Sequence, residues 1–157
     1  MTIEHNPEVK QQLLIRVPAE AVYNAFANPE ITTQFWFSHS DGPLETGTKR
    51  IWEWRMFGCS TGVDVIEATP HSRILIEWGE PSRRSSVEWT FESRADDSTL
   101  VTVRNFGLSG STQEIIAEVI DSMGGFSLVL ASCKALLEHG VHLNVIADHA
   151  PDTLLER

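Results

Sequence analysis

Tryptophan is the residue type whose placement in this sequence most directly suggests a binding chemistry. The chain has five tryptophans among 157 residues, and Trp52, Trp54, Trp78 and Trp89 fall in segments with the alternating pattern of β-strands. Side chains two residues apart on a strand share a face, so Trp52 and Trp54 should lie side by side. Aromatic rings gathered on one concave face would form an apolar pocket for a hydrophobic or aromatic molecule. For any single tryptophan, filling of the core is the more ordinary interpretation.

Two polar residues are candidates for orienting such a molecule. Asn105 follows Val101 and Val103 at strand spacing and should share their face, although hydrogen bonding to turn backbone at a strand end is the simpler role. His39 follows Trp36 in an expected loop and could act as a general acid or base. The spacing fixes no carboxylate partner for it, so a solvated loop histidine is the simpler interpretation. We assign no catalytic residue from the sequence.

The sequence motifs give little support for metal binding, nucleotide binding or nucleophilic catalysis. His139, His142, Asp148 and His149 are potential metal ligands, but Gly140 predicts a helix end that separates the two imidazoles at 139 and 142. The sequence has no phosphate-binding glycine loop, dinucleotide fingerprint, nucleophile elbow or zinc-protease helix. We therefore expect neither a metal nor a cofactor.

The charge and the cysteine content narrow the classes of partner. With 12 basic and 22 acidic residues the formal charge is −10, which disfavours nucleic acid and anionic membranes as partners. The first ten residues are polar, and we expect no apolar run of the roughly 18 residues that span a bilayer. Cys59 and Cys133 are too few for a disulfide framework and fit reduced thiols, with Cys133 a small buried apolar residue. These features predict a cytoplasmic protein.

Hydrophobic periodicity and turn residues predict an α+β fold. The expected strands cover residues 9–17, 49–57, 63–68, 73–78, 87–91 and 99–106, and the expected helices cover 19–27, 29–36 and 112–139. This order predicts a curved antiparallel sheet of about six strands wrapped around the long C-terminal helix, with two short helices after the first strand. We expect one domain over residues 1–157, with a core at 9–139 and a tail at 140–157.

The long helix carries the clearest local signals. Ser111 and Glu114 have the spacing of a capping box, and Gly140 that of a C-cap. Gly124 and Gly125 interrupt the helix and predict a kink or a close approach of backbone or ligand. The three- and four-residue spacing of the apolar residues predicts a buried face of Ile116, Val119 or Ile120, Met123, Ser127, Leu130 and Leu137.

Several short motifs occur in an order that is similar to a known family. They are Pro18 with Val22, Tyr23, Ala25 and Phe26; the corner Asn28, Pro29, Glu30; Trp36 and Phe37; Pro70, Arg73, Ile74 and Trp78; and Gly125, Phe126, Leu130, Lys134, Leu137 and Glu138. Between residues 9 and 138 the chain resembles the activator of heat-shock-protein ATPase homologue family. That family belongs to the SRPBCC superfamily of START, birch-pollen-allergen and polyketide cyclase-like proteins. Tyr23 and Phe126 stand where the family usually has tryptophan.

The resemblance implies a helix-grip fold with a cavity between sheet and helix that holds a hydrophobic or aromatic small molecule. The residues expected to line it are Trp36, Phe37, Trp52, Trp54, Trp78, Trp89, Phe91, Asn105, Met123, Phe126 and Leu130. Two alternatives remain open: a cyclase, dehydratase or hydrolase that uses the cavity, and a protein that regulates a chaperone ATPase. The apolar tail either docks on its own domain or forms a homodimer contact.

Overall fold

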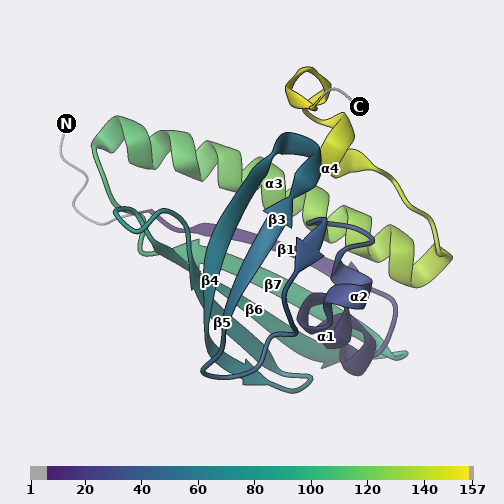
Figure 1. The fold of residues 1–157 in the computed structure, drawn as a ribbon. Coiled ribbons are helices and arrows are strands. Elements are labelled where there is room, and N and C mark those ends of the chain that lie inside the picture. Colours follow the sequence, from purple (N-terminus) through teal and green to yellow (C-terminus); the bar gives the residue numbers. More distant parts are fainter. Residues whose placement is uncertain (1–6, 156–157) are drawn as a thin grey trace.

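Strands with alternating apolar and polar residues build one antiparallel sheet in the computed structural model, which describes residues 7–155 (Figure 1). The strands are β1 Val9–Ile15, β2 His39–Ser40, β3 Lys49–Trp54, β4 Cys59–Thr69, β5 Arg73–Trp78, β6 Ser85–Arg94 and β7 Ser98–Phe106. Their order in the sheet is β1-β7-β6-β5-β4-β3-β2. The first strand therefore pairs with the last, while the other strands form a meander.

One long helix crosses the inner face of this sheet. The helices are α1 Ala19–Ala27, α2 Pro29–Thr32, α3 Thr112–His139 and α4 Val145–Asp148, with 3-10 turns η1 Arg55–Phe57 and η2 Pro151–Thr153. Figure 1 shows β3 and β4 curling toward α3 on one side, with β1 on the other and the two short helices α1 and α2 at one end. The predicted helix-grip fold is thus confirmed, with a seventh, two-residue strand that the sequence pattern did not predict.

The alternation of buried and exposed side chains along the strands is as the sequence predicts, although several strand boundaries differ. Val101 and Val103 are buried together with Trp52 and Trp89, each at 1% exposure or less. The predicted strand 49–57 ends instead at Trp54, because η1 follows and Gly58 takes a left-handed backbone conformation with φ 68°. The next strand accordingly begins at Cys59 instead of at residue 63.

The ends of α3 are formed as predicted, but its centre is not. The Ser111 hydroxyl accepts a hydrogen bond from the Glu114 amide at 3.1 Å, and Glu114 Oε1 accepts one from the Ser111 amide at 3.0 Å. Gly140 ends the helix with φ 65°. The helix runs unbroken through Gly124 and Gly125, and a Cβ at either position would meet nothing within 4 Å. The helix is therefore not interrupted at these glycines, and the predicted close approach of backbone is wrong.

The predicted buried face of α3 is also partly wrong. Leu130 is buried as expected, whereas Ile116, Ile120 and Met123 are 44%, 68% and 43% exposed. The buried residues of the helix are Ile115, Phe126, Val129, Leu130, Ser132 and Cys133. Apolar residues lie on more than one side of α3, so periodicity alone could not select the face that meets the sheet.

The composition of α3 also corrects the expectation about apolar runs. By length and composition this one helix, among the described residues, could cross a membrane. In the structure its buried face belongs to the hydrophobic core, where Phe126, Leu130 and Cys133 are at most 3% exposed. A helix at the centre of a domain passes the same compositional test.

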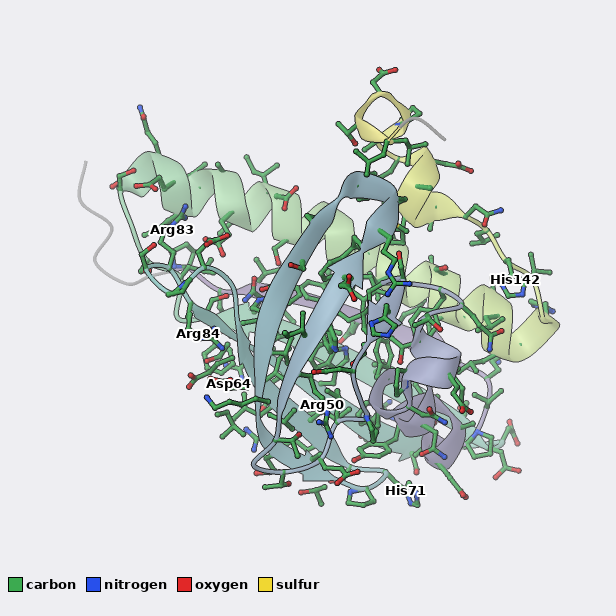
Figure 2. All side chains as sticks on the ribbon, viewed as in Figure 1. Arg50, Asp64, His71, Arg83, Arg84 and His142 are labelled. Atoms are coloured by element: carbon green, nitrogen blue, oxygen red, sulfur yellow. The ribbon has the colours of Figure 1, made fainter. Side chains whose placement is uncertain are left out.

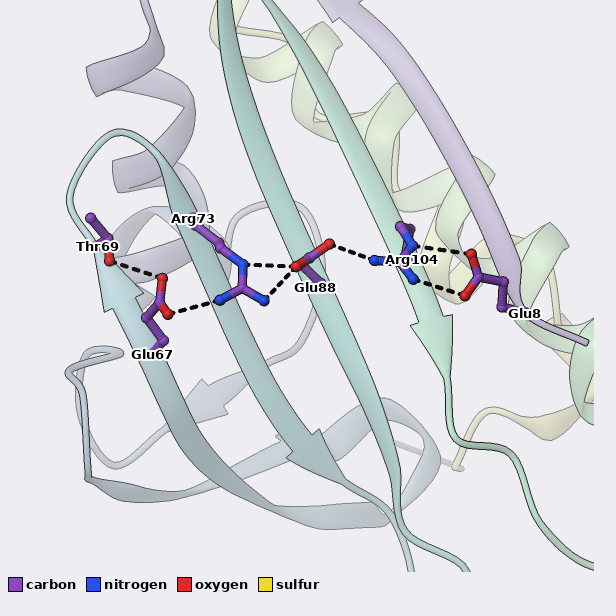
Figure 3. A network of polar contacts seen from close by, with 6 residues as sticks. All are labelled: Glu8, Glu67, Thr69, Arg73, Glu88 and Arg104. Carbon is purple, nitrogen blue, oxygen red and sulfur yellow. Dashed lines mark hydrogen bonds and ion pairs between the residues drawn. The ribbon is translucent and has the colours of Figure 1, made fainter. Parts of the chain in front are cut away.

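Charged residues form a ladder across the outer face of the sheet (Figure 3). Arg104 donates hydrogen bonds to Glu8 at 2.8 Å and to Glu88 at 2.9 Å. Arg73 donates to the other oxygen of Glu88 at 2.7 Å and to Glu67 at 2.8 Å. The bond from Arg104 holds the pKa of Glu8 below its ordinary value. This charge ladder, Glu8–Arg104–Glu88–Arg73–Glu67, joins β7, β6, β5 and β4 through side chains.

We predict that Glu88→Gln lowers the free energy of unfolding by about 2 kcal/mol, because both arginines lose a charged acceptor whose side chain is only 11% exposed. Urea unfolding measures the change. The matched control is Glu92→Gln on the same strand, whose 63% exposed side chain pairs with Arg94 and should contribute under about 0.5 kcal/mol. Equal effects of the two substitutions would contradict the prediction.

We predict that Gly124→Ala raises the free energy of unfolding by about 1 kcal/mol, because glycine is costly inside a helix and the added Cβ meets no neighbour. Gly140→Ala should have the opposite sign, since its φ of 65° strains any residue with a Cβ. Both variants are compared with the wild type by chemical denaturation. A destabilised Gly124→Ala protein would show that this part of the helix needs glycine.

Candidate functional site

The rings between the sheet and α3 pack against one another around Trp36. Trp36 follows α2, and its ring centroid lies 5.1 Å from that of Trp52, 6.0 Å from Trp89 and 5.9 Å from Phe126. We call this group the aromatic cluster; it comprises Phe26, Phe35, Trp36, Phe37, Trp52, Trp54, Trp78, Trp89, Phe91 and Phe126. Most pairs meet edge to face, the arrangement that aromatic quadrupoles favour. Phe37 and Trp52 stack at 4.5 Å.

A pocket of about 300 Å³ adjoins this cluster. Its walls are residues 33–38, Met56, Ser132 and residues 144–147, and we call it the mouth pocket. Trp36 and Phe37 belong both to its wall and to the aromatic cluster, and they are 7% and 2% exposed. The lining residues include no lysine, arginine or histidine. Five of the twelve lining residues are polar, namely Thr33, Gln34, Ser38, Ser132 and Asn144, so the mouth pocket suits a neutral molecule with polar as well as apolar groups.

The C-terminal tail forms one side of the mouth pocket. The Leu155 amide donates a hydrogen bond to the Met56 carbonyl at 2.9 Å, and the His149 ring meets the Phe57 ring edge to face at 6.3 Å. Figure 2 shows His142 where the tail leaves α3, and its Nδ1 lies 3.3 Å from the Gln34 carbonyl oxygen. The tail therefore docks on its own domain, which was one of the two predicted alternatives.

The loop between β5 and β6 holds the other end of α3. Arg83, labelled in Figure 2, lies 3.2 Å from Glu114 and 3.0 Å from Glu118, both on the first turns of the helix. Arg84 bonds the carbonyl oxygen of Glu77 at 2.9 Å and lies 3.2 Å from Asp64. The Arg83 contacts hold α3 at the end far from the mouth pocket, and the Arg84 contacts tie the loop to β5 and β4.

Asn105 is buried beneath α3, and its amide is fully engaged by the protein. Its Nδ2 donates to Ser85 Oγ at 3.0 Å and to the Ser86 carbonyl at 2.9 Å. Its Oδ1 accepts from Ser122 Oγ of α3 at 2.9 Å. The residue is 2% exposed, so these bonds satisfy an amide that would otherwise be costly to bury. In this structure Asn105 links β7, β6 and α3.

His39 has a carboxylate neighbour that the sequence could not reveal. The residue lies in β2, opposite Glu53 of β3, and its Nδ1 is 2.9 Å from Glu53 Oε2 without hydrogen-bond alignment. Arg55 Nη2 lies 3.4 Å from the same oxygen. Glu53 alternates with the buried Trp52, so this pair lies on the outer face of the sheet, and neither residue lines the mouth pocket.

The residues predicted to line a cavity fall into five groups. Trp36 and Phe37 line the mouth pocket. The rings at 52, 54, 78, 89, 91 and 126 join the aromatic cluster. Leu130 is buried in the core, and Asn105 is bonded to serines. Met123 is 43% exposed on α3, and its carbonyl accepts a hydrogen bond from Gln11.

Sequence reasoning missed the pocket wall contributed by Met56, Ser132 and residues 144–147. Met56 lies in the 3-10 turn, and residues 144–147 belong to a tail whose position depends on tertiary contacts. The apolar content of the tail was the only signal that it would pack against the domain.

Among residues 7–155 no three histidine, cysteine or acidic side chains are placed to hold a metal ion. Cys133 is fully buried, which raises the pKa of its thiol.

The geometry defines the class of this protein as a helix-grip α+β domain, with an aromatic cluster enclosed between a curved sheet and a C-terminal helix. The sequence model of the Activator of Hsp90 ATPase homolog 1-like protein family matches residues 16–138, and the chain belongs to that family. No curated protein matches the chain in sequence. The resemblance found in the sequence motifs is thereby confirmed.

Solved structures share the fold at low sequence identity. Protein SSP2350 of Staphylococcus saprophyticus has a TM-score of 0.75 and 24% identity, over 87% of this chain and 96% of that one. DynU16, from the dynemicin biosynthetic locus, has a TM-score of 0.75 and 22% identity, over 85% of this chain and 48% of its own. PFC0360w, described as an HSP90 activator from Plasmodium falciparum, has a TM-score of 0.68 and 17% identity, over 83% and 96%.

Proposed function

We propose that the protein binds a flat, neutral small molecule, which enters through the mouth pocket toward the aromatic cluster. The observation that carries this proposal is that Trp36 and Phe37 form a wall of the mouth pocket and are also part of the cluster. A ligand in the pocket would meet the aromatic surface of Trp36 and Phe37 beside uncharged polar side chains, and apolar surface combined with polar groups that orient the ligand is typical of small-molecule sites. The uncharged lining and the net charge of −10 disfavour an anionic ligand.

The proposal concerns binding and not catalysis, because the two residues considered for catalysis, Asn105 and His39, do not line the mouth pocket. Asn105 is bonded to serines beneath α3, and His39 lies beside Glu53 on the outer face of the sheet. The relative DynU16 is described as a protein of a biosynthetic locus, which agrees with a role beside small molecules. Ligand identity would follow from compounds retained during purification, identified by native mass spectrometry.

We predict that fluorene, a flat apolar probe, raises the midpoint of thermal unfolding in a concentration-dependent way, because a ligand of the folded state stabilises it by mass action. Ala147→Phe should weaken binding at least about tenfold, because Ala147 lines the mouth pocket and the added ring would fill it. Ala150→Phe is the matched control, since Ala150 lies in the same tail and does not line the pocket. Unchanged binding by Ala147→Phe, or no stabilisation of the wild type, would contradict the proposal.

A second candidate function, regulation of a chaperone ATPase, is favoured by the exposed apolar residues of α3. Ile116, Ile120 and Met123 lie at helical spacing on one side of the helix and remain 43% to 68% exposed. The relative PFC0360w is described as an HSP90 activator. An exposed apolar face on a protein of net charge −10 is a suitable contact for a protein partner.

We predict that the protein, if it has this second function, raises the ATPase rate of purified Hsp90 and that Ile120→Glu abolishes most of the increase. The charge would oppose burial of the helix face in a complex. Asp121→Lys, at the adjacent exposed position on a different side of α3, is the control for a general charge effect. No stimulation by the wild type at saturating concentration would remove this candidate.

A further inference from the structure

The aromatic cluster contains a hydrogen-bond donor without a partner. The indole Nε1 of Trp89 carries a hydrogen that can only be donated, and no acceptor in residues 7–155 takes it. Trp89 is 1% exposed. Buried donors are almost always paired in folded proteins, because removal from water without a new bond costs free energy. Among the described tryptophans, only Trp89 has an indole nitrogen that is both buried and without a partner.

The surroundings of Trp89 are aromatic. Its ring centroid lies 5.7 Å from Phe26, 6.0 Å from Trp36 and 6.2 Å from Phe126. Trp89 sits in the middle of β6, on a strand paired on both sides, so its backbone position is fixed. Aromatic faces hold flat molecules well but offer no strong acceptor for an N–H group. The donor is therefore single, rigidly placed and surrounded by surfaces suited to a flat ring.

Trp36 connects this donor to the mouth pocket. Its ring meets Trp89 on one side, and its residue forms part of the pocket wall on the other. Trp36 lies between α2 and β2, outside the paired part of the sheet. A side chain in a connecting segment can change rotamer without breaking the strand ladder. Displacement of the Trp36 ring would open a route from the mouth pocket to Trp89.

We infer that the ligand is a flat aromatic molecule with a neutral carbonyl oxygen, and that this oxygen accepts a hydrogen bond from Trp89 Nε1 after Trp36 moves aside. This inference rests on the proposed function and names the class of its ligand. The single neutral N–H group of Trp89, in apolar surroundings, is best paired by a single neutral acceptor such as a carbonyl oxygen. A carboxylate would bring a charge that no cation of the mouth pocket lining balances.

The test compares fluorenone with fluorene, two flat molecules that differ in one carbonyl group. Calorimetry should give the wild type about a five- to tenfold preference for fluorenone, as expected for one additional hydrogen bond. Trp89→Phe keeps an aromatic ring and removes the donor, so it should lower the preference to about one. Trp78→Phe is the matched control, because Trp78 belongs to the same cluster and its indole nitrogen is not a buried donor without a partner.

A second measurement uses the wild type alone and does not depend on the folding of a variant. In proton–nitrogen correlation spectra, the indole proton of Trp89 should move downfield with fluorenone and not with fluorene. Equal affinity for the two probes and an unmoved Trp89 signal would overturn the inference while leaving the proposed function standing. Absence of binding by both probes would overturn the proposed function and this inference together.

Discussion

The packing of aromatic rings of the sheet against Phe126 of α3 is the interaction on which the rest of this structure depends. The Phe126 ring lies 5.9 Å from Trp78 and 6.2 Å from Trp89, and the Trp36 ring adds contacts within 6.0 Å of Trp52, Trp78 and Phe126. Because strand side chains alternate, a slip of one residue in β3 or β6 would turn the cluster residues outward. The cluster therefore specifies strand register and the placement of α3 at the same time.

The same packing limits the space in which a ligand could bind. Rings that already touch leave the interior between sheet and helix largely filled, and the mouth pocket lies at the edge of that interior. Binding deeper than the pocket wall needs movement of a few side chains, chiefly in residues 33–37, which lie between α2 and β2. The sheet itself is braced from outside by the charge ladder, so the movable part and the rigid part are different segments of the chain.

Much of the fold could be predicted from the sequence because its signals are local. Strand parity, the capping box at Ser111 and the helix end at Gly140 depend on residues close in the chain. The exposed side of α3 could not be predicted, since several faces of that helix are apolar. The neighbour of His39 required the pairing of β2 with β3. Predicting the tail wall of the mouth pocket would have required knowledge of tertiary contacts such as that of Leu155 with Met56. Predicting the unpartnered nitrogen of Trp89 would have required the position of every surrounding group.

The pairing of β1 with β7 has a consequence for synthesis on the ribosome. Val9 faces Asn105 and Ile15 faces Thr99, so the first strand finds its partner only after more than half of the chain has been made. Until then its apolar residues, Leu13 to Ile15, have no strand to join. The meander from β3 to β7 can pair between neighbours as it emerges, whereas closure of the sheet by β1 involves a long loop. Assembly of this domain should therefore proceed from the middle outward, with the N-terminal strand among the last to dock.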